Sequence, residues 1–382
     1  MSLSNTATSE RASASRDDVR LSLQQYLLEL IPGSSDMTVN LSEEAMKAGF
    51  SAETILFKAS YRLDQKLVEE RLVFRRQIPG QEVNFDASLI TQARIMDALQ
   101  TRTSLPVPRV FGMDEEENRF GAPFLIMEQL PGRIVPQLPN YHREGWVASL
   151  DLPERAAVWE RAIRAVAAVN RVDWRNGLEF LDNPNRGTTG LQQYLSWVEE
   201  WLHWALGERS HPVAEAAVAY LRANAPVAPP VNLVWGDAIP ANLLFDADNN
   251  VSGIIDWEWA FLGPAEIDLA WWLYFDRLFS EDFNVPRLEG LPDRDTTIRT
   301  YEEALGRPVS DLPYYEILCG LRMVIATMRS VDRLVGAGRL SRANTSWLNS
   351  PSCAWVARQL GLDPVAIGPD FGEFTAALFD GR

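Results

Sequence analysis

The sequence predicts an α+β protein with a small β-rich amino-terminal lobe and a larger, mostly helical carboxy-terminal lobe. Two observations lead to this prediction. Short apolar, partly β-branched segments alternate with single helical segments up to about residue 130, and from Pro153 onward apolar residues recur mainly at helical spacing. The chain has 382 residues, of which 46% are apolar and 23% charged, so it can bury a substantial core without disulfide or zinc support.

The amino-terminal lobe is predicted over residues 15–130. Residues 1–14 are polar and rich in Ser and Ala, which predicts a disordered tail. An amphipathic segment at 19–31 then predicts the first helix. The other elements expected in this lobe are strands at 37–41, 54–63, 67–76, 109–113 and 123–128 and a helix at 85–101.

The carboxy-terminal lobe is predicted over residues 131–382. Apolar residues three or four apart indicate helices along most of it, and one β-rich segment at 231–257 interrupts them. The helices are expected at 154–172, 191–206, 213–223, 264–279, 296–305, 314–334 and 354–360.

Charge and composition exclude several classes of protein. The net charge is −16, from 52 acidic and 36 basic residues, which disfavours nucleic-acid binding because such binding depends on Lys and Arg at phosphates. The best apolar stretch, 317–328, is interrupted by Arg322, and the amino terminus lacks the apolar segment of a secretion signal, so we expect no membrane span. Two cysteines exclude a disulfide framework. We expect a cytoplasmic protein with a small-molecule partner; its oligomeric state is left open.

Polar residues follow apolar segments inside the β-rich interruption, where a buried core would not place them. Asp237 and Asn242 are five residues apart on a predicted loop, and Asp256 follows the apolar segment 251–255. This set suits phosphoryl transfer. One carboxylate can orient a hydroxyl and accept its proton, while an amide oxygen and a second carboxylate hold Mg²⁺ on nucleotide phosphates.

Three motifs carry a resemblance to a known family. G-D-x-x-x-x-N at 236–242, I-I-D-W-E at 254–258 and D-L-A at 268–270 resemble the aminoglycoside phosphotransferase/choline kinase-like family, small-molecule relatives of the protein kinases. The likeness covers about residues 45–280 and is strongest to a bacterial branch with W-G-D at the loop. It implies a two-lobed protein-kinase-like fold, ATP and Mg²⁺ as cofactors, and transfer of the γ-phosphate to a hydroxyl of an aminoglycoside or another hydroxylated metabolite.

The resemblance implies a role for each polar residue of these motifs. Asp237 would be the catalytic base, Asn242 and Asp256 the Mg²⁺ ligands, and Asp268 would brace the catalytic loop by accepting backbone N–H bonds. Each residue taken alone could equally cap a turn, as Asp and Asn often do. The four together at this spacing favour the phosphotransferase interpretation.

The resemblance also implies nucleotide contacts in the amino-terminal lobe. Ser51 and nearby backbone N–H groups would contact phosphate, and Arg75 would grip phosphates from a strand. Glu128 and Leu130 match the inter-lobe hinge, whose backbone would bind adenine. A polar hairpin turn at Ser51 and a surface charge at Arg75 remain the alternatives.

Three positions depart from the family pattern. Trp235 replaces a His two residues before the catalytic Asp, Arg75 replaces a Lys, and Gln92 replaces the helix carboxylate that pairs with it. We expect Trp235 to fill the slot of the His and support the loop, and Arg75 to find a partner within 82–86. These departures leave open a catalytically weak or inactive nucleotide-binding pseudokinase.

The acceptor is the least constrained part of the prediction. An acidic cleft near Asp237 and Glu258 would attract a polycationic aminoglycoside, so Glu258 is a candidate acceptor contact. Aromatic residues such as Trp271 and Tyr274 would suit a flatter, less charged acceptor, although core packing explains most of them. By the resemblance, choline-like compounds, sugars and hydroxyacyl thioesters are further acceptor classes.

Overall fold

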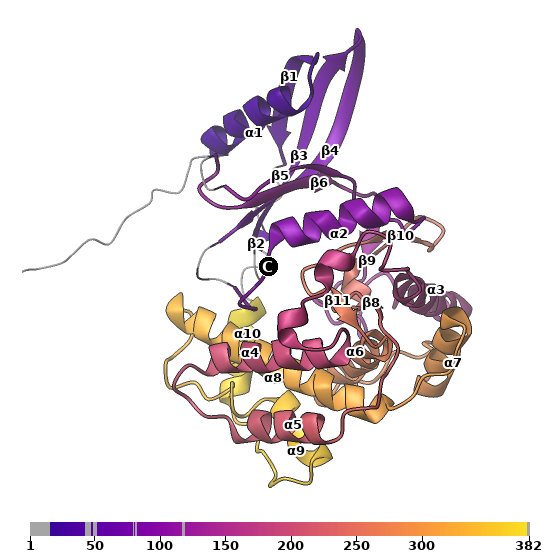
Figure 1. Ribbon diagram of the computed structural model, residues 1–382, viewed down its shortest axis with the longest axis vertical. Helices are drawn as coiled ribbons and strands as arrows, with labels where there is room; N and C mark the ends of the chain where they lie inside the picture. Colours follow the sequence, from indigo (N-terminus) through magenta and orange to yellow (C-terminus); the bar gives the residue numbers. More distant parts are fainter. Residues whose placement is uncertain are drawn as a thin grey trace, which may run out of the picture.

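The computed structural model has two lobes, an antiparallel sheet with two helices and a larger helical lobe (Figure 1). This confirms the α+β, two-lobed architecture that the sequence predicts. The predicted tail at 1–14 and the predicted phosphate contact Ser51 lie outside the described residues. The structure describes residues 16–42, 47–48, 52–78, 80, 82–116 and 119–379.

The sheet of the amino-terminal lobe has the strand order β1-β3-β4-β6-β5, with β2 beside β3 and all pairs antiparallel. The predicted hairpin is present as β3 and β4. They are joined at Asp64 and Gln65, whose φ values of 50° and 64° suit a type I′ turn, which matches the twist of the strands. The strands are β1 (Ser35–Leu41), β2 (Lys47–Ala48), β3 (Ala52–Leu63), β4 (Lys66–Gln77), β5 (Val110–Asp114) and β6 (Phe124–Glu128).

A helix packs on each face of this sheet (Figure 1). Successive side chains of a strand point to opposite faces, and in β6 both faces are buried. Phe124 and Ile126 join a core with the first helix, whereas Leu125 and Met127 join a core with the second. The helices are α1 (Arg16–Leu30) and α2 (Leu89–Arg102).

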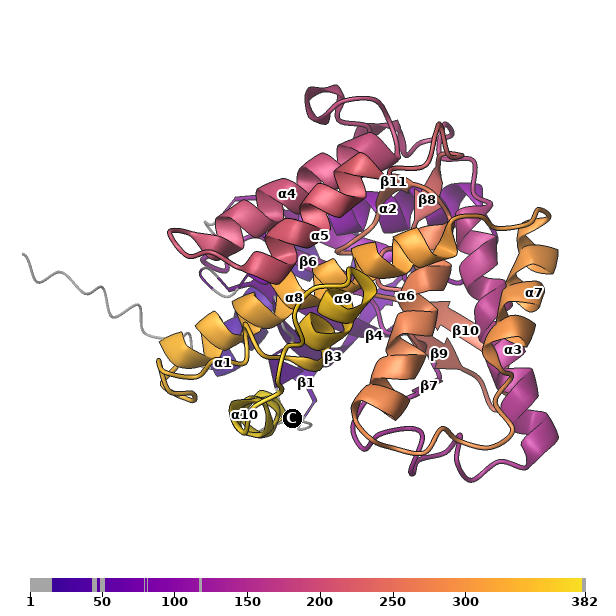
Figure 2. The same ribbon diagram turned by 90° about the horizontal axis from the view of Figure 1, so that it is seen from below.

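The carboxy-terminal lobe is a group of helices around two small sheets, β10-β9-β7 and β11-β8 (Figure 2). Every helix predicted here is present with ends within three residues of the prediction, and α10, β7 and β11 were not predicted. The helices are α3 (Leu152–Asn170), α4 (Leu191–Leu206), α5 (Pro212–Ala223), α6 (Glu266–Arg277), α7 (Arg294–Leu305), α8 (Leu312–Gly336), α9 (Pro351–Gln359) and α10 (Asp370–Phe379). The strands are β7 (Arg133–Ile134), β8 (Asn232–Val234), β9 (Leu243–Phe245), β10 (Val251–Ile254) and β11 (Phe261–Gly263).

The two lobes are joined through one apolar core. The segment before α2 lies on α4, where Trp201 Nε1 donates to the Val83 main-chain oxygen at 2.8 Å and Trp197 Nε1 donates to Asp86 Oδ1 at 2.8 Å. The rings of Phe85 and Trp197 stack with their centres 6.0 Å apart. The core that contains α2 therefore continues into the helical lobe.

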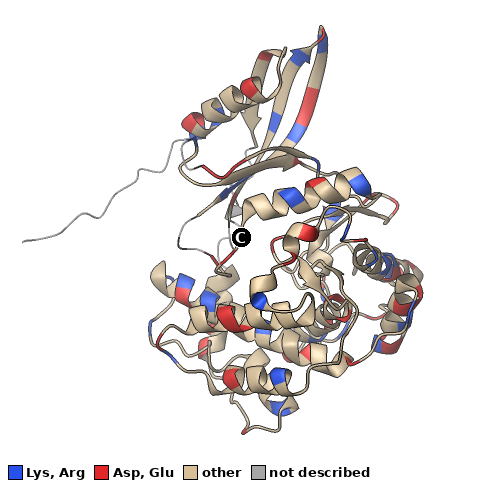
Figure 3. Cartoon of the chain, viewed as in Figure 1, with Lys and Arg blue, Asp and Glu red and all other residues tan. Residues whose placement is uncertain are grey.

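The passage from one lobe to the other follows β6, which ends at Glu128, and β7 at Arg133–Ile134 already pairs with β9 of the helical lobe. The lobe boundary near residue 130 stays a prediction. Acidic and basic residues are interspersed over both lobes (Figure 3). Among the described residues, no helix combines the length and the apolar character needed to cross a membrane.

Candidate active site

The loop between β8 and β9 brings Asp237 and Asn242 into contact. The Asn242 amide nitrogen donates to Asp237 Oδ2 at 2.7 Å and to the Asp237 main-chain oxygen at 3.0 Å. The other carboxylate oxygen, Oδ1, accepts a hydrogen bond from Trp271 Nε1 at 2.8 Å. Asp237 is half-buried. Two donors therefore fix its carboxylate while part of the residue stays accessible.

Gly236 makes the turn before Asp237 possible. Its φ is +85°, in the left-handed region that favours glycine. A Cβ at this position would overlap the main-chain oxygen of Trp259. A glycine is therefore required at position 236 for steric reasons, because any side chain would push the loop away from the main chain of Trp259.

The electrostatic surroundings of Asp237 are unusual for a surface carboxylate. Burial and, after it, the neighbouring Asp256 carboxylate raise the pKa of Asp237 to about 6. The hydrogen bonds from Trp271 and Asn242 and the charge of Arg322 act in the opposite direction. A carboxyl whose pKa is raised by burial and by a neighbouring carboxylate, in a partly open site, is a common feature of functional sites.

Asp256 follows β10 in a conformation that is uncommon for a residue with a side chain. Its φ is 62°, a region that Asp and Asn tolerate better than most residues. The buried Trp235 donates from Nε1 to the main-chain oxygens of Ile255 and Asp256, both at 3.1 Å. The indole at the departure from the family pattern thus holds the turn that presents Asp256.

Arg75 reaches from β4 to the helical lobe. Its Nη1 donates to Gln92 Oε1 at 2.9 Å and lies 3.6 Å from Asp256 Oδ1, and its Nη2 lies 3.9 Å from Glu258 Oε2. The amide of Gln92 therefore contacts the arginine at the place of the expected carboxylate. The expectation of a charged partner within 82–86 is wrong, because the acidic partners come from the segment after β10 in the other lobe.

Asp268, in the first turn of α6, holds the backbone of the loop before Asp237. Its Oδ1 accepts the Gly236 N–H at 2.8 Å, and its Oδ2 accepts the Trp235 N–H at 2.8 Å and the Asn170 side-chain N–H at 2.6 Å. Burial raises the pKa of Asp268, and these hydrogen bonds oppose that rise. The carboxylate is thus surrounded by three donors.

The segment at the predicted hinge leaves the sheet between the lobes. The Glu128 N–H donates to the Arg109 main-chain oxygen at 2.8 Å, and the Gln129 N–H donates to the Arg71 main-chain oxygen at 2.9 Å. Leu130 follows, half-buried, and its side chain lies against Gly253 of β10. The backbone contact of Glu128 and Leu130 with adenine stays a prediction.

Three residues of this site were not predicted from the sequence. Trp271 was attributed mainly to the core, and nothing distinguishes it from neighbouring indoles in the sequence. Asn170 ends α3, far from the motifs. Arg322 of α8, which donates from Nη2 to the Gly236 main-chain oxygen at 2.5 Å, had a signal, because it is a charge in the middle of an apolar stretch.

The oxygens of Asn242 and Asp256 suit a Mg²⁺ site. Asp256 Oδ1 is buried and has no hydrogen-bond partner among the described residues, and the Asn242 amide nitrogen is turned toward Asp237. Hard oxygen ligands are those that Mg²⁺ prefers, and it needs few protein ligands when phosphates and waters complete its shell. In the described part of the chain, no group of three or more His, Cys, Asp or Glu side chains is placed to hold a metal.

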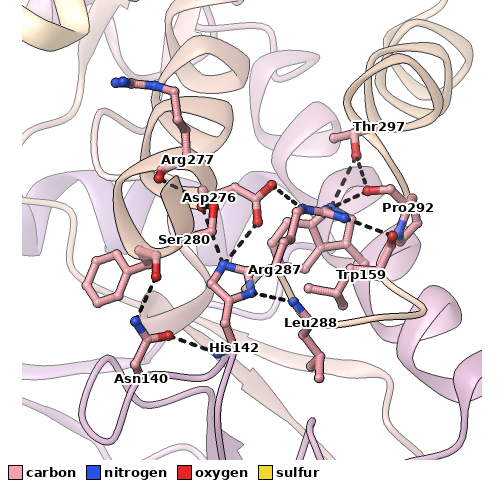
Figure 4. Close-up of polar contacts among 12 residues, drawn as sticks. Asn140, His142, Trp159, Asp276, Arg277, Ser280, Arg287, Leu288, Pro292 and Thr297 are labelled. Carbon is pink, nitrogen blue, oxygen red and sulfur yellow. Dashed lines mark hydrogen bonds and ion pairs between the residues drawn. The ribbon is translucent and has the colours of Figure 1, made fainter. Parts of the chain in front are cut away.

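A second polar network lies at the other end of α6 (Figure 4). His142 Nε2 is 3.4 Å from Asp276 Oδ1, and His142 Nδ1 accepts the Leu288 N–H at 3.2 Å. Arg287 Nε donates to Asp276 Oδ2 at 2.8 Å, and its other nitrogens donate to the main-chain oxygens of 291–292. Burial lowers the pKa of His142 to about 4. The network ties two loops to the end of the helix.

Solved structures share this fold. A candidate aminoglycoside phosphotransferase from Ralstonia eutropha is 21% identical, with a TM-score of 0.63 over 89% of this chain and 98% of that one. An ethanolamine kinase of Plasmodium vivax is 11% identical, with a TM-score of 0.56 over 90% of this chain and 86% of that one. At these identities the likeness shows the two-lobed fold alone.

Sequence comparisons identify the family as well as the fold. The probable acyl-CoA dehydrogenase IBR3 of Arabidopsis thaliana is 30% identical over 213 residues, which cover 53% of this chain and 24% of that protein. The chain thus spans about a quarter of the length of this curated relative. Residues 48–301, more than half of the chain, match the model of the phosphotransferase enzyme family. The chain therefore belongs to the phosphotransferase enzyme family.

Proposed function

We propose that this protein is a small-molecule kinase that transfers the γ-phosphate of ATP, with Mg²⁺, to a hydroxyl of its acceptor. The observation that carries the proposal is the meeting of Asp237, Asn242 and Asp256 around one point, opposite Arg75 of the other lobe. Turn capping alone would not explain why the Asp256 carboxylate lies near enough to Asp237 to raise the pKa of that carboxyl. Membership of the phosphotransferase family supports the same chemistry.

Asp237 would act on the acceptor. Its carboxylate would accept the proton of the hydroxyl while that oxygen attacks the γ-phosphorus, and ADP would leave with the electron pair of the broken P–O bond. The hydrogen bonds from Trp271 and Asn242 fix the carboxylate, so the hydroxyl would meet an oxygen that is already oriented. This orientation is the main contribution of the loop.

Other residues would hold the nucleotide. Asn242 and Asp256 would bind Mg²⁺, which supplies positive charge against the phosphates when bound. Arg75 would contact the phosphates through its fork, and Ser51 would add a contact from the loop between the first strands. The backbone of Glu128 and Leu130 would receive adenine.

The test is an ADP-release assay with the purified chain, ATP and Mg²⁺ over a panel of acceptors. Asp237→Asn removes the proton acceptor and keeps the shape of the side chain, and we expect a loss of about 1000-fold in kcat. The matched control is Asp248→Asn, an exposed carboxylate in the turn between β9 and β10, with unchanged kcat expected. Equal rates for the wild type and Asp237→Asn would refute the assignment.

The same assay separates a kinase from a pseudokinase. Thermal stabilisation by ATP that depends on Mg²⁺ is expected for both. ADP release with some acceptor is expected only for the kinase. Stabilisation by ATP without ADP release over the whole panel would favour the pseudokinase.

The acceptor panel follows from chemistry and from the relatives. Aminoglycosides, amino alcohols and sugars represent the cationic and neutral classes. Glu258 lies 3.9 Å from Arg75 Nη2, so a cationic acceptor that contacts Glu258 would compete with that arginine. Hydroxyacyl thioesters form a second class with its own support, because the Arabidopsis relative bears the name of an acyl-CoA dehydrogenase. The class with the highest kcat/KM identifies the acceptor.

A further inference from the structure

Helix α8 carries a fully buried arginine in its middle. Arg322 is 0% exposed, and its Nη2 donates to the Gly236 main-chain oxygen at 2.5 Å. Its guanidinium carbon lies 4.0 Å from the ring centre of Trp271 and 4.8 Å from that of Trp259. Nε and Nη1 have no hydrogen-bond partner among the described residues. The charge is thus buried against aromatic rings and one neutral oxygen.

Stability of the fold does not explain this residue. A permanent charge is costly to bury without a directly paired carboxylate. Among the described residues Arg322 makes no side-chain hydrogen bond to a carboxylate, although its charge lowers the pKa values of Asp237 and Asp268 against the effect of burial. Its helix neighbours Leu321 and Val324 are apolar and buried as well. An apolar side chain at 322 would fill the same space without that cost, so the guanidinium serves some other purpose.

Two contacts of the guanidinium, with the Gly236 oxygen and with the Trp271 ring, lead to Asp237. The Gly236 carbonyl belongs to the peptide bond that joins Gly236 to Asp237, and the N–H of the same glycine is held by Asp268 Oδ1 at 2.8 Å. The Trp271 ring beneath the guanidinium donates its N–H to Asp237 Oδ1. One side chain therefore supports both the backbone and the carboxylate of the same residue.

We propose that Arg322 is a positioning residue for phosphoryl transfer: it holds the peptide bond and the indole that orient Asp237 and does not touch the substrate. The inference rests on the proposed function, because the orientation of Asp237 affects a rate only if Asp237 acts on the acceptor. Misplacement of a reacting group by about 1 Å lowers a rate by about 100-fold. The effect should fall on kcat, since nucleotide and acceptor contacts are left in place.

The experiment measures kcat and both KM values in Arg322→Met and Arg322→Lys. Methionine keeps the apolar stem and removes the fork, and we expect kcat to fall about 30- to 100-fold with each KM within about threefold. Lysine keeps a charge and one donor for the Gly236 oxygen, and we expect it to recover about tenfold of that loss. A rescue of this kind would not follow from a role in packing alone.

The matched control is Arg277→Met. Arg277 also lies over two rings, 4.8 Å from the centre of Tyr274 and 4.2 Å from that of Trp355, and one of its nitrogens is likewise unpartnered. It is paired with Asp282 at the far end of α6, away from the Asp237 loop. We expect Arg277→Met to lower the melting temperature and to leave kcat within about twofold.

A second readout is independent of turnover. The indole N–H signal of Trp271 in a ¹H–¹⁵N spectrum, assigned with Trp271→Phe, should shift in Arg322→Met and stay in place in Arg277→Met. An unmoved signal together with an unchanged kcat in Arg322→Met overturns the inference, as does an equal loss of kcat in both methionine variants.

If Arg322→Met does not fold, Arg322→Lys and Trp271→Phe decide: a loss of kcat at constant KM in both supports the inference, and wild-type kcat in either overturns it. A wild-type protein without ADP release refutes the proposed function instead, and the Trp271 signal still tests the contact.

Discussion

Helix α6 supports a polar network at each end, and the two networks differ in how their charges are compensated. At the carboxy-terminal end, Asp276 faces Arg287 and His142, and both ring nitrogens of that histidine have partners (Figure 4). At the amino-terminal end, the neighbouring Asp256 carboxylate contributes to the raised pKa of Asp237, and Arg75 Nη1 of the other lobe lies 3.6 Å from Asp256 Oδ1. In each network one buried carboxylate oxygen, Asp276 Oδ1 or Asp256 Oδ1, has no hydrogen-bond partner among the described residues. The first network lies within the helical lobe, whereas the second joins two neighbouring carboxylates to a cation of the other lobe; we refer to the second as the open network.

The comparison shows that a shifted pKa does not by itself mark a reactive site. The pKa of His142 moves about as far from its usual value as that of Asp237. Its cause is burial of a ring that is held by neutral and acidic partners. What distinguishes the Asp237 region is a pair of neighbouring carboxylates, Asp237 and Asp256, an arrangement that a further bound cation would stabilise.

Among the changes that compare the two networks, Asp268→Asn has the largest expected effect. An amide offers one acceptor to three donors and turns its own N–H₂ toward them, so buried N–H groups lose their partners. We expect a loss of about 3 kcal/mol in the free energy of unfolding and about 100-fold in kcat/KM. Urea unfolding and the ADP-release assay measure the two effects.

Asp276→Asn is the counterpart at the other end of the same helix. It removes the charge that faces Arg287, and we expect a loss of about 2 kcal/mol in the free energy of unfolding. Its contacts do not include the Asp237 loop, so kcat/KM should stay within about twofold. If both variants lost activity in proportion to stability, the distinction between the two networks would be wrong.

His142→Gln should change how the free energy of unfolding depends on pH, and the size of this effect is intermediate. The pKa of His142 is about 4 in the folded protein and 6.5 without the shift, so the unfolded chain binds the proton first as the pH falls. The contribution of the buried neutral imidazole to the free energy of unfolding is therefore fully present above pH 6.5. It is lost as the pH falls toward 4, by about 1.4 kcal/mol per pH unit for one proton. Denaturant unfolding at several pH values should show a shallower dependence in the variant.

His211 serves as the internal reference for that measurement. Burial lowers its pKa in the same direction, but it is present in both proteins, so its contribution cancels in the difference. Equal pH slopes for the wild type and His142→Gln would contradict the burial argument. Activity at pH 7.5 should be the same in both.

Arg75→Lys has the smallest expected effect and tests the open network from the other lobe. A lysine can replace only one of the contacts that the arginine fork makes to Gln92, Asp256 and Glu258. We expect KM for ATP to rise about fivefold with little change in kcat. The control is Arg76→Lys, because Arg76 points to the opposite face of β4 and pairs with Glu53. A rise in KM in both variants would argue against a nucleotide contact.

Local patterns in the sequence predicted most of the fold. The hairpin of β3 and β4, α4 and the long α8 follow from periodicity and breakers, which depend on neighbouring residues. The start of α2 lies at Leu89 rather than at 85, because Ser88 caps it by accepting the Thr91 N–H, and residues before it pack on α4 instead. Such a boundary depends on a distant surface, which periodicity does not report.

The residues of the candidate site likewise fall into those that the sequence predicted and those that it did not. Motif spacing identified Asp237, Asn242, Asp256 and Asp268, and the structure brings the first three together with the fourth behind them. The partners of Arg75 and the place of Arg322 were not predicted, since these contacts join residues far apart in the chain, such as 322 and 236. Long-range contacts between single polar residues leave no periodic trace.

The docking of residues 83–86 on α4 limits how the two lobes can move. Rigid-body separation would break the indole bonds of Trp197 and Trp201 and expose the Phe85 ring to water. Since α2 shares this core, it should travel with the helices below it during any movement of one lobe against the other. Bending is then left to the opposite face of the sheet, where α1, β1 and one face of β3, β4 and β6 form a separate small core.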